Sequence, residues 1–265
     1  MTATARYALQ TLLVCAFLAF LGFWLYEFSE SPSNQIFGAT LVRGPSNQRV
    51  VALTYDDGPN PPYTTAILDV LEREHVHATF FLVGRAVKAY PAIVRREVRD
   101  GDAVGNHTWS HAHMILMPAS QVRSSLERTD EAIYRAAGVH TRIMRPPFGA
   151  RDWLVLDQAR RLGYTPVMWS VPLPGDWDQP PARIIADRVM PYVQDGAIIV
   201  LHDGNRGIVC AQMRAPGKTC DRHAEIEATQ ILIERLRKEG YRFVTVPELL
   251  ALRGNAMHIH ARGTE

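Results

Sequence analysis

From Arg49 onward, short apolar segments alternate with longer segments of helical periodicity, and this alternation limits the fold more than any other feature of the chain. Alternation of this kind predicts β/α units arranged around a parallel sheet. Most of the apolar segments are hydrophobic enough to be buried on both faces of such a sheet. Seven strands are expected, at Val50–Tyr55, Ala78–Val83, Ala103–Asn106, Arg142–Arg145, Thr165–Val171, Ala197–Leu201 and Arg242–Val246.

Helices are expected between these strands. The clearest lies near Arg222–Lys238, where apolar residues recur at helical spacing and Gly240 supplies a stop. Seven β/α units can close into a barrel or lie as an open, doubly wound sheet, and periodicity does not choose between the two. Both architectures place chemistry at the carboxyl ends of the strands. The other helices are expected around Tyr63–Glu74, Ala86–Arg99, Pro118–Ala137, Arg151–Leu162 and Ala182–Val193.

The segment Tyr7–Tyr26 carries no charge and is long enough to cross a hydrocarbon core as a helix. Arg6 precedes it, while Glu27 and Glu30 follow it, so the positive-inside rule places the amino terminus in the cytoplasm and the rest outside. The alternative is a cleaved secretory signal, but Trp24–Phe28 offers no small-x-small cleavage site. We therefore favour a membrane signal-anchor, and either alternative exports the domain.

These patterns divide the chain into four parts. Residues 1–28 are expected to form a short cytoplasmic stub and the transmembrane anchor, and residues 29–48, rich in Ser, Pro, Asn and Gly, a tether. Residues 49–253 are expected to form one α/β domain, and residues 254–265 a tail. His258 and His260 in this tail could bind stray metal, but we interpret them as part of a disordered terminus.

Charge and cysteine content restrict the partners and the compartment. Basic residues number 29 and acidic residues 27, with no long block of either sign, so nucleic acid is not expected as a partner. Cys15 lies in the apolar segment, whereas Cys210 and Cys220 flank a loop of the exported part. An oxidising compartment favours a disulfide between them, and two free thiols are the alternative.

Two adjacent carboxylates, Asp56 and Asp57, follow the first expected strand within the sequence TYDDGP. Neighbouring carboxylates repel each other, so the pair needs a cation, a hydrogen-bond donor or solvent. With a metal present, one carboxylate can be a ligand and the other can hold the attacking water as a general base. A solvated Asp-Gly turn is the structural alternative.

His107 and His111 follow the third expected strand, and their spacing lets both imidazoles converge on one ion if the segment turns. Two histidines and one aspartate form an open site, which leaves positions for water and substrate. Two unrelated histidines are the alternative, because this spacing alone is a weak motif. His113 is a weaker candidate that we expect to be a neighbour of the site.

Three more polar residues follow later strands. Arg145 begins a proline-stiffened loop, where it is either a clamp for a carboxylate or an ordinary surface arginine. His202 ends the sixth strand and could donate a proton to a leaving amine, with Asp176 orienting it and raising its pKa. Polar groups at the ends of five of the seven expected strands are hard to explain structurally, so their joint placement favours a catalytic site.

The sequence resembles the polysaccharide deacetylases with a NodB-homology domain, carbohydrate esterase family 4, over about Arg49–Leu250. It contains the five motifs of that family in order: TYDDGP, HTWSH, RPPFG, GDW and LHDG. The resemblance implies an irregular seven-stranded (β/α) barrel and one divalent metal, usually zinc, although such a ligand set also accepts cobalt or nickel. The implied reaction removes N-acetyl groups from N-acetylglucosamine residues of an extracytoplasmic polysaccharide, such as peptidoglycan or a chitin-like glycan.

The resemblance also implies a role for each residue that matches a motif. The implied metal ligands are Asp57, His107 and His111; the catalytic residues are Asp56 as base, His202 as acid, Arg145 holding the base and Asp176 tuning the acid; the substrate-binding residues are Phe148 through its backbone amide, Trp177 in the groove and Leu201 in the acetyl pocket.

Two departures from the family pattern concern the groove. Tyr55 stands where the family often has Phe, a mild change if the hydroxyl reaches a partner. The segment Trp169–Trp177 contains prolines and lacks an additional Asp that many members have, which leaves the substrate preference open. An O-acetyl esterase acting on a xylan-type glycan is therefore an alternative. A non-catalytic carbohydrate-binding domain is another, but it predicts the loss of Asp56, His202 or a metal ligand, and none is lost.

Overall fold

The computed structural model describes residues 3–213 and 220–253. The expected tail, with His258 and His260, lies outside these residues. The helices are α1 (Ala3–Glu30), α2 (Tyr63–Arg73), α3 (Gly84–Ala89), α4 (Pro91–Arg99), α5 (Ala119–Ala137), α6 (Trp153–Arg161), α7 (Ala182–Val189) and α8 (His223–Lys238). The strands are β1 (Val50–Asp56), β2 (Thr79–Leu82), β3 (Ala103–Asn106), β4 (Ile143–Met144), β5 (Thr165–Pro166), β6 (Ala197–His202) and β7 (Arg242–Phe243).

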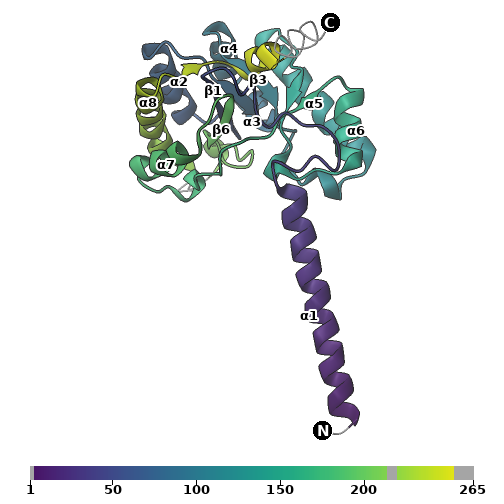
Figure 1. Cartoon of the computed structure of the whole chain (residues 1–265). Helices are drawn as coiled ribbons and strands as arrows, with labels where there is room; N and C mark the ends of the chain where they lie inside the picture. The colour runs from purple at the N-terminus through teal and green to yellow at the C-terminus, as the bar shows by residue number, and fades with distance from the viewer. Residues whose placement is uncertain (1–2, 214–219, 254–265) are drawn as a thin grey trace, which may run out of the picture.

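These strands form one parallel sheet in the order β5-β4-β3-β2-β1-β6, and β7 pairs with the first two residues of β1. The sheet is curled, with helices packed around it (Figure 1). No ladder joins the two ends of the described sheet, but the Ser170 N–H beyond β5 donates to the Ile198 carbonyl of β6 over 3.1 Å. The α/β class and the seven parallel strands are confirmed, in the form of a curled half-barrel.

Several of the expected elements have different bounds in the structure, including β7, which ends at Phe243 and not at Val246, and two others show the physical reason. The single helix expected at Ala86–Arg99 is divided into α3 and α4 at Tyr90. Pro91 has no N–H to donate and disfavours a helical conformation at the preceding residue, although it fits the first position of a new helix. The fifth strand, expected at Thr165–Val171, ends at Pro166, because the chain beyond it leaves the ladder with β4.

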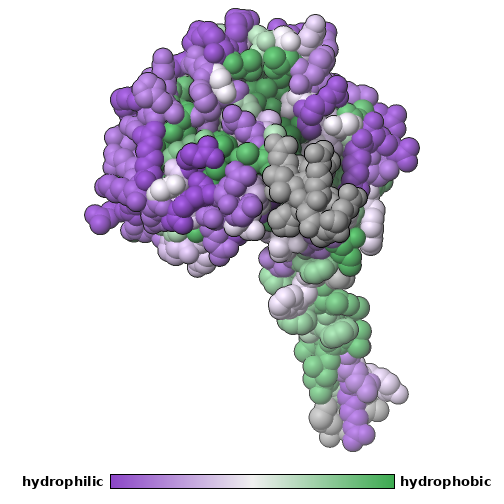
Figure 2. All heavy atoms as spheres, turned by 45° about the horizontal axis from the view of Figure 1, so that its top comes forward, coloured by the Kyte–Doolittle hydropathy of each residue, from purple (hydrophilic) through white to green (hydrophobic). Residues whose placement is uncertain are grey.

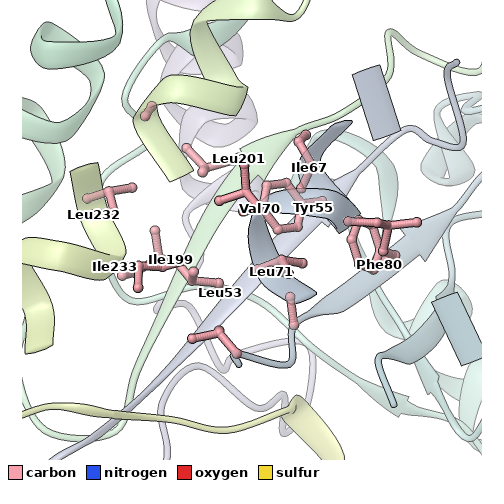
Figure 3. Packing of buried hydrophobic residues seen from close by; sticks show 14 of the residues in the cluster. Leu53, Tyr55, Ile67, Val70, Leu71, Phe80, Ile199, Leu201, Leu232 and Ile233 are labelled. Atoms are coloured by element: carbon pink, nitrogen blue, oxygen red, sulfur yellow. The ribbon is translucent and has the colours of Figure 1, made fainter. Parts of the chain in front are cut away.

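The strands β1 and β6 separate two hydrophobic clusters by simple alternation. Val51, Leu53 and Tyr55 of β1 face the helices, whereas Val50 and Ala52 face the interior of the curled sheet. The helix-side cluster, part of which Figure 3 shows, joins β1, β2 and β6 to α2 and α8. Its labelled members are Leu53, Tyr55, Ile67, Val70, Leu71, Phe80, Ile199, Leu201, Leu232 and Ile233.

The Tyr55 hydroxyl is buried in this cluster and shares a hydrogen bond of 2.7 Å with the hydroxyl of Thr229 on α8. The hydroxyl by which Tyr55 differs from Phe therefore has a hydrogen-bond partner. Continuing the alternation, Thr54 and Asp56 follow Ala52 on the interior face. Strand β1 thus delivers a carboxylate to the open end of the half-barrel interior.

Helix α1 extends away from the rest of the molecule (Figure 1). Within it, Thr4–Trp24 is long and apolar enough to cross a membrane, and none of its most apolar window is buried by the described residues. In Figure 2 the hydrophobic colour of α1 contrasts with the largely hydrophilic surface of the sheet-and-helix part. The segment expected as a tether, residues 29–48, lies against the domain in places, with Leu41 buried and bridged to Val167.

Candidate active site

The candidate site lies at the carboxyl ends of the strands, where the motif residues from five loops meet. Asp56 ends β1 and is the direct neighbour of His202, which ends β6, in the parallel register. Both side chains continue the interior faces of their strands, after Ala52 and Thr54 in β1 and after Ile198 and Val200 in β6. A cleft of about 210 Å³ opens above them.

Asp57, His107 and His111 form a buried cluster whose ligand atoms all lie within 4.8 Å of one another. The Asp57 Oδ1 atom is 3.5 Å from His107 Nε2 and 3.2 Å from His111 Nε2. That oxygen is buried, and no described residue donates a hydrogen bond to it. A buried carboxylate oxygen facing two imidazole nitrogens fits a divalent cation, because otherwise it would lose solvation without compensation.

The protonation of these imidazoles also suits metal binding. Burial lowers the pKa of His107 to about 3, and burial lowers the pKa of His111 as well, so both rings are neutral at physiological pH. His107 Nδ1 lies 2.8 Å from the Arg145 carbonyl, to which it donates in the neutral ring. That hydrogen bond leaves the Nε2 lone pair directed at the cluster.

Asp56 has a different partner from its neighbour. Its Oδ1 accepts a hydrogen bond of 2.6 Å from the guanidinium of Arg145, which is fully buried. Arg145 also donates to Thr54 Oγ1 over 2.8 Å and stacks on the ring of Phe81, with 4.0 Å between guanidinium carbon and ring centroid. The other carboxylate oxygen of Asp56 lies 3.9 Å from His107 Nε2, beside the metal cluster.

The backbone conformation explains why the two adjacent carboxylates have different partners. Asp57 has a φ of 80°, so the chain turns sharply after β1 and sends its side chain away from that of Asp56. The next residue is Gly58, where a Cβ atom would lie 2.0 Å from the Asp203 carboxylate. The remaining oxygen of Asp57, Oδ2, accepts a hydrogen bond of 2.6 Å from the Arg206 N–H. The turn therefore requires Gly58 and is fixed by the loop after β6.

His202 is paired with Asp176. The Asp176 Oδ2 atom accepts from the His202 backbone N–H over 2.6 Å, and both carboxylate oxygens lie 3.1 Å from the ring Nδ1. Burial alone favours a neutral imidazole, but the charge and the hydrogen bond of Asp176 outweigh it and raise the pKa of His202 to about 9. Gly175, with a φ of 68°, allows the turn that presents Asp176.

The aromatic candidates form the walls of the cleft. Phe148 has a φ of 61° and places its ring against His111 and His113, with centroids 4.5 and 3.9 Å apart. His113 is therefore a neighbour of the site and not part of the metal cluster. Trp177 is half-exposed and stands edge-on to His202, with 5.5 Å between centroids.

The structure corrects the position expected for Leu201. Its side chain is fully buried between the sheet and the helices, among the residues of Figure 3. Alternation along β6 instead turns Val200 to the interior, where it lines the cleft. The sequence pattern alone also did not identify Asn205 and Arg206, which line the cleft directly after the LHDG motif. Their position next to that motif is the signal that could have indicated them.

A disulfide lies in the segment after β6, downstream of Arg206, whose N–H donates to Asp57. Cys210 and Cys220, separated by 10 positions, are bonded, as expected. Asn60 joins this disulfide to the end of β6, because its side-chain amide donates to the carbonyls of Asp203 and Cys220 over 3.2 and 3.1 Å.

Replacing both Cys210 and Cys220 with Ser is expected to lower the free energy of unfolding by about 2–4 kcal/mol, because the unfolded chain gains conformational freedom. Urea unfolding of the full chain in detergent, followed by fluorescence, measures this change. Cys15→Ser, which removes the exposed free thiol, is the matched control. Equal unfolding midpoints for the double variant and the control would contradict a stabilising role.

Comparisons with known proteins match this arrangement. Residues 43–167 match the family model described as polysaccharide deacetylase. A peptidoglycan-N-acetylglucosamine deacetylase of Bacillus cereus is 32% identical over 207 residues, which are 78% of this chain and 90% of that protein. The chain belongs to the polysaccharide deacetylase family.

Other relatives of this deacetylase-family chain are longer. The peptidoglycan-N-acetylmuramic acid deacetylase PdaC of Bacillus subtilis is 34% identical over 204 residues, which cover 77% of this chain but only 39% of PdaC. Among solved structures, the Bc1960 peptidoglycan N-acetylglucosamine deacetylase superposes with a TM-score of 0.71 at 32% identity, covering 79% of this chain and 92% of that one. The fold match thus covers most of this chain and nearly all of that one.

Proposed function

We propose that this protein is a metal-dependent hydrolase that removes N-acetyl groups from N-acetylglucosamine residues of a polysaccharide outside the cytoplasm, either peptidoglycan or a chitin-like glycan. The observation that supports it most is the division of two adjacent carboxylates between two tasks. Asp57 faces two imidazoles, whereas Asp56 is held by a buried arginine beside them. The names of the relatives, which act on peptidoglycan, support the substrate class.

The proposed metal ligands are Asp57, His107 and His111, and the proposed metal is zinc, with cobalt or nickel as alternatives for the same ligand set. Such an ion would lower the pKa of a bound water and polarise the acetamide carbonyl. The orphaned Asp57 Oδ1 and the fixed tautomer of His107 support this assignment. Three protein ligands leave room for water and substrate.

Asp56 is the proposed general base, which takes the proton of the attacking water. Its hydrogen bond with Arg145 fixes the direction of the carboxylate. The Phe148 backbone N–H is the proposed donor to the oxygen that gains charge during attack, and Trp177 is the proposed groove wall beside the sugar. Val200 takes the place that the family resemblance had given to Leu201 in the acetyl pocket.

His202 is the proposed general acid, which gives its proton to the departing sugar nitrogen so that acetate and a free amine are released. Asp176 positions the ring through Nδ1, which leaves Nε2 for the leaving group. The buried Asp176 carboxylate also stabilises the imidazolium form. The proton needed for amine departure is therefore available at neutral pH.

The pH dependence of the reaction follows from this pair. Because the pKa of His202 is raised to about 9, the acid is protonated at neutral pH, and kcat is expected to fall only as pH rises through about 9. Asp176→Asn removes the stabilising charge, so this fall should move towards the ordinary imidazole pKa of about 6.5. The measurement is the pH profile of kcat, with the exposed neighbour Asp178→Asn as control. An alkaline limb unmoved by Asp176→Asn would count against this pairing.

The proposed location is the cell membrane, with the catalytic domain outside. In this arrangement residues 1–28 form the cytoplasmic stub and the single-pass signal-anchor, residues 29–48 the connection and residues 49–253 the deacetylase domain. The uncovered apolar surface of α1 supports an anchor. Secretion after cleavage of this segment is the alternative.

Substrate profiling tests the proposal. Full-length protein in detergent, stripped of metal and then supplied with zinc, should release acetate from N-acetylglucosamine oligomers or peptidoglycan. Acetylated xylan in parallel reactions tests the O-acetyl esterase alternative. Acetate from xylan alone would replace the proposed substrate, and no acetate from any of the three despite bound zinc would favour a carbohydrate-binding domain.

A further inference from the structure

The carboxyl-terminal end of α1 contacts the part of the molecule that contains the candidate active site. Helix α1 contacts the turn Pro147–Gly149, which follows β4 and contains Phe148 of the cleft. The Asn34 side-chain amide donates to the Phe28 carbonyl of α1 over 2.9 Å. The anchor helix therefore ends beside the carboxyl ends of the strands, where the candidate active site lies.

Arg151 fixes this connection. Its guanidinium is fully buried and donates to the carbonyls of Ser31 and Asn34 over 2.7 and 2.6 Å. The same guanidinium donates to the Gly149 carbonyl over 2.8 Å, so it joins the first residues after α1 to the loop of the cleft. Only two residues separate Phe28, on α1, from Ser31, the first residue held by Arg151. The domain cannot move far from the end of α1 while these bonds persist.

An apolar surface lies next to this connection. We call the side chains of Ile36, Phe37, Trp153 and Leu154 the basal patch. Ile36, Trp153 and Leu154 are 58%, 64% and 38% exposed, and the rings of Phe37 and Trp153 pack edge to face with centroids 4.9 Å apart. Ile36 is joined to the connection through its N–H, which donates to the Asn34 side chain over 2.9 Å. Exposed apolar groups gathered in this way mark a contact surface.

We infer that the basal patch rests on the lipid bilayer, at the level of the headgroups, beside the point where α1 leaves the hydrocarbon core. This inference rests on the proposed membrane anchor. A span of uncovered apolar residues ends at Trp24, 12 residues before Ile36 of the patch, and the connection between them is too short and too firmly bonded to lift the patch away. Tryptophan and its apolar neighbours also suit a membrane interface, where amphipathic rings and apolar side chains concentrate.

This placement determines where the cleft opens. A second groove runs from the end of α1 to the cleft, lined by Glu27 and Ser31 on one side and by Phe148, Trp169 and Leu173 on the other. The last three residues also line the cleft itself. Glu27 lies three residues beyond Trp24, the last residue of the apolar span, which is about 5 Å along a helix. The catalytic groups would therefore act on acetylated glycan close to the membrane surface.

A spin label attached to the patch tests the inference in full-length protein. The variant Trp153→Cys, in a Cys15→Ser background, would be labelled with a nitroxide and reconstituted into lipid nanodiscs. The matched control is Lys238→Cys, an exposed position at the end of α8, on the amino-terminal side of the sheet. Paramagnetic relaxation by oxygen, which concentrates in lipid, is compared with relaxation by a water-soluble nickel chelate.

The label at position 153 is expected to relax more with oxygen than with nickel, and the label at position 238 the reverse. Two labels that both respond mainly to nickel would overturn the inference, because the patch would face water. A label at position 153 shielded from both reagents would overturn it in favour of a protein partner or a second copy of the chain. Acetate release from soluble oligomers by the same samples separates these outcomes from a failure of the proposed activity.

Discussion

Asp56→Asn is expected to lower kcat for acetate release by a factor of about 10²–10⁴ while zinc content stays unchanged, because an amide cannot take the proton of the attacking water. Asparagine keeps the shape of the side chain and an oxygen that can accept from Arg145. The measurement combines steady-state kinetics on N-acetylglucosamine oligomers with metal analysis of the same preparation.

Asp57→Asn is the matched control, since it makes the same chemical change one residue further along. Asp57 faces His107 and His111, so this variant should lose zinc as well as activity. Equal zinc loss in both variants, or equal retention, would contradict the division of tasks between the two carboxylates.

Arg145→Met is expected to lower the free energy of unfolding by about 3–5 kcal/mol, because it leaves the buried charge of Asp56 without its partner. Methionine retains much of the apolar volume over Phe81, so the loss reports mainly on the charge. Urea unfolding of the full chain in detergent gives the change. Activity should fall in the same variant, since the carboxylate loses the donor that orients it.

Two further variants test whether the unpaired charge of Asp56 causes the loss of stability in Arg145→Met. Arg95→Met, at an exposed position of α4, should change the free energy of unfolding by no more than about 0.5 kcal/mol. Adding Asp56→Asn to Arg145→Met removes the uncompensated charge and should restore part of the lost stability. If Arg145→Met lowered the free energy of unfolding as little as Arg95→Met does, the buried ion pair would not contribute to stability.

Much of the fold was predictable because strands and helices leave different periodicities. Strand β3 has the predicted bounds, and β1 differs from its prediction by one residue, Asp56. Short strands such as β5 were less predictable, because tertiary pairing decides where they end. The division between α3 and α4 was signalled by Pro91, but an otherwise continuous helical pattern concealed it.

The candidate site was predictable as a set of polar residues at strand ends, and the family resemblance implied their partners, but the residues alone did not assign separate roles to the two adjacent aspartates. Which of Asp56 and Asp57 faces the histidines depends on the positive φ of Asp57, a local conformation that neither residue type dictates. Leu201 was misplaced by one position, and in a strand one position exchanges the two faces. The close contact of residues 31–34 with Arg151 was also not predictable, because a sequence rich in Ser, Pro and Asn is equally typical of a free tether.

Acetate release by the full-length protein, before and after metal removal, tests the central claim most directly. The account predicts that metal-free protein is inactive on N-acetylglucosamine oligomers, that zinc restores acetate release, and that zinc restores none in Asp57→Asn. Acetate released at an undiminished rate by metal-free protein, or by Asp57→Asn, would contradict the account.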